Sequence, residues 1–436
     1  MTKVTRRYLR LSALAAVLVT IAAACAEADV TIGAVVDDTD SGPGVPIPPT
    51  EDASGLQDAD ATSDARIDGD VEQPSRTCTD EGWCHTELPP GQTLRDVWGD
   101  GSGTVWTVSE EGKILRWTGT AWAESHDAGV ALYAIWGSSP TDLWAGGGEK
   151  TTFGTVVPGV LLHGTGTSAD KITWTVISTP MAIRSIWGSG ATDIWAVASL
   201  AHRVNRADPS YVLHYAGPLA DTDAGDADGG DGGIPLEGGW EIHPVSSAFP
   251  AHFEKVWGTS ADDVWIGSRV PPAFSSGTPT GQVLHFAPDG DGSLAWRTEQ
   301  PPAPNTARVD MNGFALSRNL TYVVGFHGDA NSPYLHTGES NDDGATFTWS
   351  QRTAAQTGFA NNGLSTIWGM GPNDLWVGGQ RGRIRHWDGT SWRVAAVSVD
   401  AVMPMQNAVH AIWGSGPDDI WVVGADIALH KVKPGM

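Results

Sequence analysis

The chain has 436 residues, a length that allows two or three average domains or one large repeat fold. Its formal net charge of −25 argues against nucleic-acid binding, which requires a basic surface. Hydrophobic residues make up 40% of the chain, so most of it can fold, but its 21 tryptophans exceed what an ordinary enzyme composition requires.

Residues 1–24 predict a secretory signal peptide. Residues 1–10 are basic, and the apolar run from Leu11 to Ala23 is too short for a membrane span. The stretch Ile-Ala-Ala-Ala-Cys at 21–25 resembles a bacterial lipobox, although Ala22 stands where Leu is usual. We therefore expect Cys25 to carry a lipid that anchors the exported protein to the cell envelope, at the outer membrane or cell surface. The alternative is plain cleavage and secretion.

Residues 25–77 form the second predicted region, a lipidated cysteine followed by an acidic tether. Residues 26–77 carry 13 acids and two bases and show no hydrophobic period, which is typical of a disordered linker. Pairing of Cys78 with Cys84 in an oxidising compartment would leave Cys25, the third cysteine, for the lipid. Two free buried thiols are the alternative to that disulfide.

A tryptophan repeat occupies the rest of the chain, residues 78–436. The unit A-I-W-G-S-S-P-T-D-L-W, with two tryptophans eight residues apart, begins at Ala134. Further copies follow at 185–195, 255–265, 366–376 and 411–421, with a diverged copy at 96–106 and a weak one that uses Phe314 and Tyr322. Each pair precedes a motif of the I-R-H-W type, and most units then have another tryptophan.

Each unit predicts four short strands, here named A to D in chain order. Seven such units indicate an all-β fold, a seven-bladed β-propeller of four-stranded antiparallel blades. The last unit stops at His430 without strand D, whereas E-G-W-C-H-T-E-L at 81–88 looks like one. We predict that this N-terminal strand, which contains Trp83, completes the last blade and removes two open sheet edges.

The pattern W-G-x-x-x-x-D-x-W, followed by I-L-H-W and D-G-T-S-W, resembles the Trp-rich propeller repeats of bacterial exported lipoproteins over roughly residues 80–433. The segment 340–349, S-N-D-D-G-A-T-F-T-W, also resembles the Asp-box of BNR repeats. That motif is a structural turn in sialidases and in many non-enzymatic propellers. The resemblance therefore implies the fold rather than a chemistry.

Residues that recur at one position in successive blades are expected to build the scaffold. A histidine recurs on strand C, where we expect it to pack beside tryptophan, and an aspartate recurs in the A–B turn, where we expect it to cap turn amides. Because the histidines are distributed around the ring, they cannot share one metal ion, and we expect no metal and no cofactor. The acidic insertion 217–239 does not match calcium-loop spacing. The histidines are His163, His214, His285, His336, His386 and His430, and the aspartates are Asp142, Asp193, Asp263, Asp374 and Asp419.

Positions that vary between blades are free for binding. The residue three before the first tryptophan of each pair is predicted to ring the channel mouth, and the long B–C loops of blades 2 to 5 should lie on the same face. We expect a protein partner or a glycan to bind there; plain solvation and loop drift are the alternatives. The mouth residues are Arg95, Tyr133, Arg184, Glu254, Met311, Ser365 and His410, and the loops contribute Lys150, Phe153, Arg203, Arg206, Arg269, Phe274, His327 and Asp329.

No catalytic motif emerges, since G-x-S-x-G, H-E-x-x-H and a phosphate loop are all absent. We expect a monomeric, non-enzymatic, surface-anchored binding or scaffold propeller that contacts the membrane only through its lipid. A glycoside-processing, sialidase-like enzyme is the first alternative. A purely structural cell-surface protein is the second.

Overall fold

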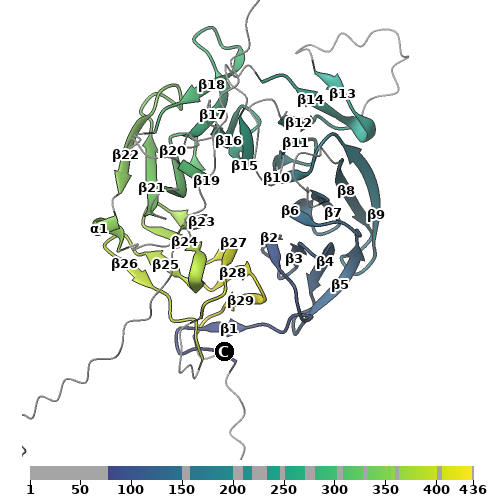
Figure 1. Ribbon diagram of the computed structural model, residues 1–436, viewed down its shortest axis with the longest axis vertical. Helices are drawn as coiled ribbons and strands as arrows, with labels where there is room; N and C mark the ends of the chain where they lie inside the picture. Colours follow the sequence, from purple (N-terminus) through teal and green to yellow (C-terminus); the bar gives the residue numbers. More distant parts are fainter. Residues whose placement is uncertain are drawn as a thin grey trace, which may run out of the picture. The chain divides into compact units, whose positions relative to one another are not determined.

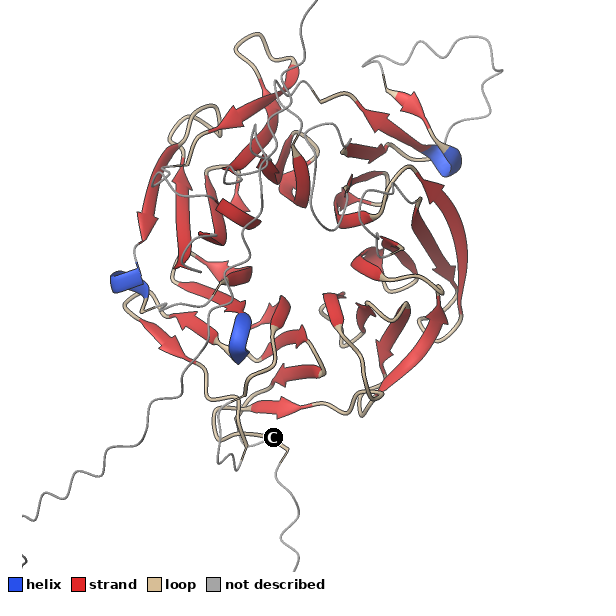
Figure 2. Cartoon of the chain, in the orientation of Figure 1, coloured by secondary structure: helices blue, strands red, loops and turns tan. Residues whose placement is uncertain are grey.

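A computed structural model describes residues 77–149, 158–199, 210–218, 233–245, 251–270, 280–301, 308–327, 332–352, 354–358, 363–399 and 405–434. These residues form seven antiparallel sheets arranged as blades around a common centre (Figure 1). The arrangement confirms the predicted seven-bladed β-propeller. Figure 2 shows that helix in the described residues is confined to short segments, namely η1 (Glu237–Gly239), α1 (Ala354–Thr357) and η2 (Gln380–Gly382).

The first three blades follow the order of the repeats. Blade 1 contains β2 (Leu94–Gly99), β3 (Val105–Ser109), β4 (Lys113–Trp117) and β5 (Trp122–Asp127). Blade 2 contains β6 (Leu132–Ser139), β7 (Asp142–Gly148), β8 (Gly159–Gly166) and β9 (Ile172–Thr179). Blade 3 contains β10 (Ile183–Gly190), β11 (Asp193–Ala198), β12 (Tyr211–Tyr215) and β14 (Trp240–His243), with β13 (Ile234–Pro235) as an extra edge strand.

The remaining blades close the ring. Blade 4 contains β15 (His252–Ser260), β16 (Asp263–Val270), β17 (Thr280–Pro288) and β18 (Leu294–Glu299). Blade 5 contains β19 (Arg308–Ser317), β20 (Leu320–His327), β21 (Ser332–Glu339) and β22 (Thr348–Arg352). Blade 6 contains β23 (Leu364–Gly371), β24 (Asp374–Gly379), β25 (Ile384–Trp387) and β26 (Trp392–Val394). Blade 7 contains β27 (Val409–Gly416), β28 (Asp419–Gly424), β29 (Ile427–Lys431) and β1 (Trp83–His85).

The spacing of the tryptophan pairs reflects the A–B hairpin. The two aromatic residues of a pair lie directly opposite each other across the hairpin, as Trp136 and Trp144 do in blade 2. In the weak fifth unit Phe314 lies opposite Tyr322 in the same way, and this unit forms a complete blade. The spacing of eight residues within a pair therefore corresponds to the end of one strand, a tight turn and the start of the next strand.

The glycine after the first tryptophan receives the indole ring of the preceding blade. A Cβ atom added at Gly137 would lie 2.9 Å from the ring of Trp98, closer than carbon atoms normally approach, so only glycine fits there without a shift. The W-G dipeptide thus encodes contact between blades as well as the turn. The same contact joins Trp136 to Gly188, Trp187 to Gly258, Trp368 to Gly414 and Trp413 to Gly99, whereas Trp257 packs on Gly313, the residue before Phe314.

The second tryptophan belongs to a polar network within each blade. In blade 4 the rings of Trp265 and His285 stack with centroids 3.7 Å apart, and both donate hydrogen bonds to Asp263 Oδ1, at 3.1 and 2.7 Å. Thr259 Oγ1 donates to the other carboxylate oxygen. We expected the aspartates to cap turn amides, but here the partners are side chains. The stack and the His–Asp hydrogen bond recur at Trp144/His163/Asp142, Trp195/His214/Asp193, Trp376/His386/Asp374 and Trp421/His430/Asp419.

His336 departs from that expectation. Strand β21 is shifted by one residue relative to the other blades, so Thr337 lies opposite Tyr322 and His336 lies opposite Val323. A one-residue shift places a side chain on the other face of a sheet. His336 therefore sits beside Tyr334, whose ring centroid is 5.0 Å away, on the face that packs toward blade 4.

The N-terminal strand closes the ring, as predicted. In β1, Trp83 is opposite Lys431 and Cys84 is opposite His430 of β29. Trp83 is fully buried and meets the ring of Trp376 edge-on at 5.4 Å.

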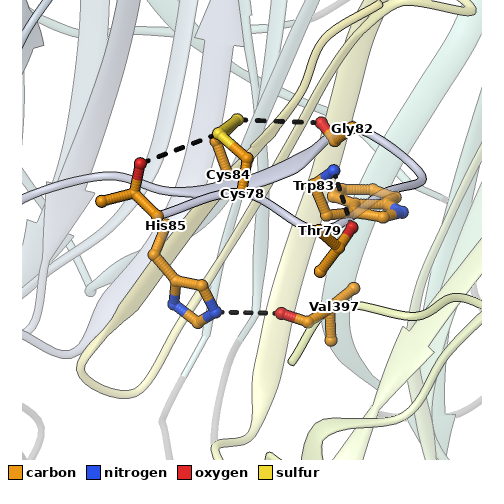
Figure 3. Close-up of a disulfide and its surroundings, with 8 residues drawn as sticks. Cys78, Thr79, Gly82, Trp83, Cys84, His85 and Val397 are labelled. Atoms are coloured by element: carbon orange, nitrogen blue, oxygen red, sulfur yellow. Dashed lines mark hydrogen bonds between the residues drawn. A yellow bond between two sulfur atoms is a disulfide. The ribbon is translucent and has the colours of Figure 1, made fainter. Parts of the chain in front are cut away.

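A disulfide joins Cys78 to Cys84 beside this closing strand (Figure 3). The tight turn inside the loop requires Gly82, which has a φ of 83° and leaves no room for a Cβ beneath Val432 O. His85 Nε2 lies 2.9 Å from the carbonyl oxygen of Val397, which ties the closing segment to the chain that follows β26 of blade 6 (Figure 3).

The signal peptide, Cys25, the tether through residue 76 and residues 219–232 of the acidic insertion lie outside the described residues. In the part that is described, no helix has the length and apolar character needed to cross a membrane.

Candidate functional site

The innermost strands of all seven blades line one cavity of about 830 Å³. These strands surround the centre of the ring in Figure 1. The variable residue that precedes each first aromatic residue by three positions contributes to the lining in every blade. These residues are Arg95, Tyr133, Arg184, Glu254, Met311, Ser365 and His410.

The two ends of the cavity differ in chemistry. The variable residues make the end that we call the mouth, and the first aromatic residue of each pair lines the cavity further along the same strands. Because six of these aromatic residues are tryptophan, this second end, the aromatic end, is apolar. The aromatic lining consists of Trp98, Trp136, Trp187, Trp257, Phe314, Trp368 and Trp413.

Cations outnumber carboxylates in the lining, although the whole chain carries a net charge of −25. The cations are Arg95, Arg184, Lys255 and Arg269, and the carboxylates are Asp96 and Glu254. Burial raises the pKa of Asp96, which accepts hydrogen bonds from the backbone N–H groups of Val97 and Ile135. We call the four cations the basic arc.

Tyr133 lies between two arginines of the basic arc. The guanidinium carbon of Arg184 is 4.3 Å from the centroid of the Tyr133 ring, and that of Arg95 is 5.8 Å away. Both distances fall within the range of cation–π attraction. The three side chains come from three consecutive blades, so the contact requires blades 1, 2 and 3 to pack side by side.

His410 fixes the position of Arg95. His410 Nδ1 is 2.7 Å from the carbonyl oxygen of Leu94, so this nitrogen carries the proton, and Nε2 accepts a hydrogen bond from Arg95 Nη1 at 3.3 Å. Burial and the positive charge of Arg95 lower the pKa of His410, which is therefore neutral at pH 7. Glu110 Oε1 lies 3.2 Å from Arg95 Nε and holds the guanidinium from its other side.

Glu254 performs the corresponding task for Arg269. Its Oε1 atom is 3.4 Å from Arg269 Nε, and its Oε2 atom accepts a hydrogen bond from the backbone N–H of Met311 at 2.8 Å. The carboxylate thus positions an arginine and links blade 4 to blade 5. Ser365 links blades in a similar way, because its hydroxyl donates to the carbonyl oxygen of Val409 at 2.5 Å.

His252 is a lining residue that the sequence reasoning missed. It lies opposite Arg269 in the β15–β16 hairpin and is only 1% exposed. Neither of its ring nitrogens has a hydrogen-bond partner within the described residues. Burial, with a smaller effect of Arg269, lowers its pKa to about 4. The signal lay in the repeat: the corresponding residues are Thr93, Ala131, Ala182, Val309, Gly363 and Ala408, all small or apolar except Thr93.

The structure thus brings Arg95, Tyr133, Arg184, Glu254, Arg269 and His410 to one cavity. Arg203 and Arg206 lie outside the described residues, as do Lys150, Phe153, Phe274 and Asp329, and the side chain of His327 is not described either. No group of three His, Cys, Asp or Glu side chains suited to a metal ion occurs in the described ranges.

No family model matches this chain, and no curated protein sequence matches it. Solved structures match its fold. YCF48 bound to D1 peptide is 15% identical, with a TM-score of 0.53 over 83% of this chain and 100% of that chain. YCF48 from Cyanidioschyzon merolae is 14% identical, with a TM-score of 0.53 over 80% and 99%. The WD40 propeller domain of Doa1 is 11% identical, with a TM-score of 0.50 over 80% and 96%. The fold is therefore a seven-bladed β-propeller similar to YCF48 and WD40 propellers.

Proposed function

We propose that this chain is a non-enzymatic binding propeller that takes a segment of a partner protein into the mouth of its central cavity. The observation that carries the proposal is the convergence of seven structurally equivalent but chemically different side chains on one cavity of about 830 Å³. A cavity of this size, with a few charged groups at one end and apolar walls at the other, is typical of ligand sites.

The contrast with the scaffold residues supports this proposal. The recurrent aspartates and histidines are engaged with one another and with tryptophan inside the blades, as Asp263 and His285 are. Mouth residues instead contact one another across blades, as Arg184 and Tyr133 do. Such differences between repeats are expected where residues serve a ligand rather than the fold.

The comparisons add one consideration. The similar structure of YCF48 is described as bound to D1 peptide. A peptide ligand for the present propeller is therefore a reasonable extension, although the similarity itself concerns only the fold.

Three assays on the purified full chain test this proposal against its alternatives. We expect a random-peptide display library to yield binders, a glycan array to yield none, and a panel of fluorogenic glycosides to remain uncleaved. Glycan binding alone would favour the lectin-like alternative, and glycoside cleavage would favour the sialidase-like enzyme. Absence of peptide binding, glycan binding and glycoside cleavage would favour a purely structural protein.

A substitution in the mouth sharpens the peptide assay. Tyr133→Ala removes the ring between Arg95 and Arg184, and we expect affinity for a selected peptide to fall about tenfold, as for an aromatic residue at an interface centre. Val394→Ala, on the outer strand β26 where Val394 is 61% exposed, is the matched control and should leave affinity unchanged. Equal affinity of the two variants would place binding elsewhere.

We also propose that the protein is exported and lipid-anchored through Cys25. The signal-like residues 1–24 support this proposal, and so does the Cys78–Cys84 disulfide, because such bonds persist in oxidising compartments. Metabolic labelling with a radioactive fatty acid should mark the wild-type protein and not the Cys25→Ser variant. Equal labelling of both would contradict lipidation at this residue.

A further inference from the structure

Among the described residues, the charged side chains that line the cavity come from one side of the ring. The basic arc comes from blades 1, 3 and 4, through β2, β10, β15 and β16. Among the described lining residues of blades 5 to 7, none carries a formal charge at pH 7, since their polar members are Asn312, Ser365, Thr366, Gln380 and neutral His410. Blades 1 to 4 thus contribute four cations and two carboxylates to the described lining, an excess of positive charge that favours a ligand with negative charge on this side.

His252 is a second, independent observation on the same side. An imidazole that is 1% exposed and lacks a hydrogen-bond partner among the described residues is unfavourable for folding, because a buried polar group left unsatisfied costs about 1–3 kcal/mol. Its ring lines the cavity opposite Arg269. Since its pKa is about 4, the ring is neutral at pH 7 and has one N–H group to donate to a ligand oxygen.

We propose that the partner segment is an acidic peptide, whose carboxylates bind the basic arc and accept a hydrogen bond from His252. This inference rests on the proposed function and specifies its ligand. Arginine presents a planar fork of N–H donors that matches a carboxylate, and Arg95 and Arg269 are already held in place by Glu110 and Glu254. The site is thus preorganised for an anion before the ligand arrives.

The aromatic end of the cavity favours a peptide over an acidic oligosaccharide. The same cavity that holds the basic arc continues to the six tryptophans and Phe314 of the first aromatic positions. A peptide supplies both carboxylates and apolar side chains in one chain, so its acidic residues can remain at the mouth while an apolar side chain enters the aromatic end. We therefore expect acidic residues next to apolar ones in the ligand.

The composition of peptides selected on the full chain tests this inference. We expect Asp and Glu to be enriched and Lys and Arg depleted relative to the input library, with apolar residues adjacent to the acids. Selection of peptides without acidic enrichment would overturn the inference and leave the proposed function standing. Selection of no peptide at all would overturn both. Arginine-dependent binding of polygalacturonate without peptide binding would show that the anion is carried by a glycan instead.

Charge variants locate the site. Arg184→Gln and Arg269→Gln should each weaken binding of a selected peptide about tenfold or more, because each removes a charge-assisted hydrogen bond. Arg393→Gln removes the same charge from the outer strand β26, where the Arg393 side chain is 73% exposed, and should have no effect. Equal loss in all three variants would indicate non-specific attraction and overturn the site.

His252→Leu separates binding from folding. Removing the unpartnered imidazole should leave the midpoint of thermal unfolding at pH 7 unchanged or raise it, whereas affinity for the selected peptide should fall about tenfold through the lost hydrogen bond. Replacing each Glu of the peptide by Gln should reduce the difference between the wild type and His252→Leu. Unchanged affinity in His252→Leu would overturn the role of this residue.

Discussion

Blades 4 and 5 are neighbours with the same four-strand topology, yet their interiors differ. Blade 4 contains the complete network of Asp263, Trp265 and His285, all at most 1% exposed. Blade 5 has Leu320 and Tyr322 at the positions of the aspartate and the second tryptophan, and its third strand is shifted by one residue. Both blades nevertheless keep the aromatic pair across the A–B hairpin. The aromatic hairpin therefore suffices to specify a blade. The polar network is an addition, and we expect the stability of a blade that contains it to depend on its buried polar groups.

The largest expected effect comes from removing the buried carboxylate of blade 4. Asp263→Ala leaves the N–H groups of Trp265 and His285 and the hydroxyl of Thr259 without their acceptor, and should destabilise the protein by about 4 kcal/mol. The midpoint of thermal unfolding measures this loss.

Asp142→Ala in blade 2 is the control, because the Asp142 side chain is 28% exposed and water can replace the lost acceptor. We expect a loss of about 1 kcal/mol there. Equal losses at the two positions would show that burial does not govern the strength of the network.

The second largest expected effect is a loss of folding stability at acidic pH, through His252 of blade 4. The pKa of His252 is 6.5 in the unfolded chain and about 4 in the folded one, so between these values the unfolded state binds more protons and stability falls as the pH is lowered. From pH 6.5 to pH 5 the contribution of His252 should decrease by about 2 kcal/mol. Comparing urea unfolding of the wild type and His252→Leu isolates this part, since burial also lowers the pKa of His285 and that loss remains in both proteins. Identical pH profiles would contradict the assignment.

The smallest expected effect is a loss of folding stability at alkaline pH, through Tyr322 of blade 5. Burial raises the pKa of Tyr322 from 10.0 to about 12, so above pH 10 the unfolded state loses its proton first and stability decreases. Between pH 10 and pH 11 the decrease due to Tyr322 should be about 1 kcal/mol. Tyr322→Phe should abolish this component, whereas Trp265 of blade 4 has no ionisable group and Trp265→Phe should not. An alkaline profile that Tyr322→Phe leaves unchanged would contradict the prediction.

The same comparison shows what the sequence could predict. Strand order, blade number and closure by Trp83 follow from the aromatic spacing, because few structures other than a hairpin of two short strands fit an eight-residue spacing with a turn motif inside it. The shift of β21 was not predictable, since the L-H sequence of blade 5 looks the same as in other blades while Thr337, not His336, meets Tyr322. A one-residue register choice depends on packing that the local sequence does not record.

The candidate site was predictable in position but not in contacts. Counting three residues back from each first aromatic residue located Arg95, Tyr133 and Arg184 on the cavity. The contacts between these side chains across blades depend on side-chain conformations and on the angle between sheets. An alignment of the repeats gives neither the conformations nor the angle. Aligning the repeats five residues before each first aromatic residue would have singled out His252, but its burial without a hydrogen-bond partner among the described residues is visible only in the folded chain.

The closing disulfide has a mechanical consequence. Any tension applied to the chain ahead of Cys78 enters the propeller at its seam, where the three-residue strand β1 holds the two ends of the ring together. The covalent bridge conveys that load straight to Cys84 in the middle of β1 and bypasses the turn at Gly82. The load therefore reaches β1 at its central residue, where Cys84 lies opposite His430 of β29, rather than at its first residue.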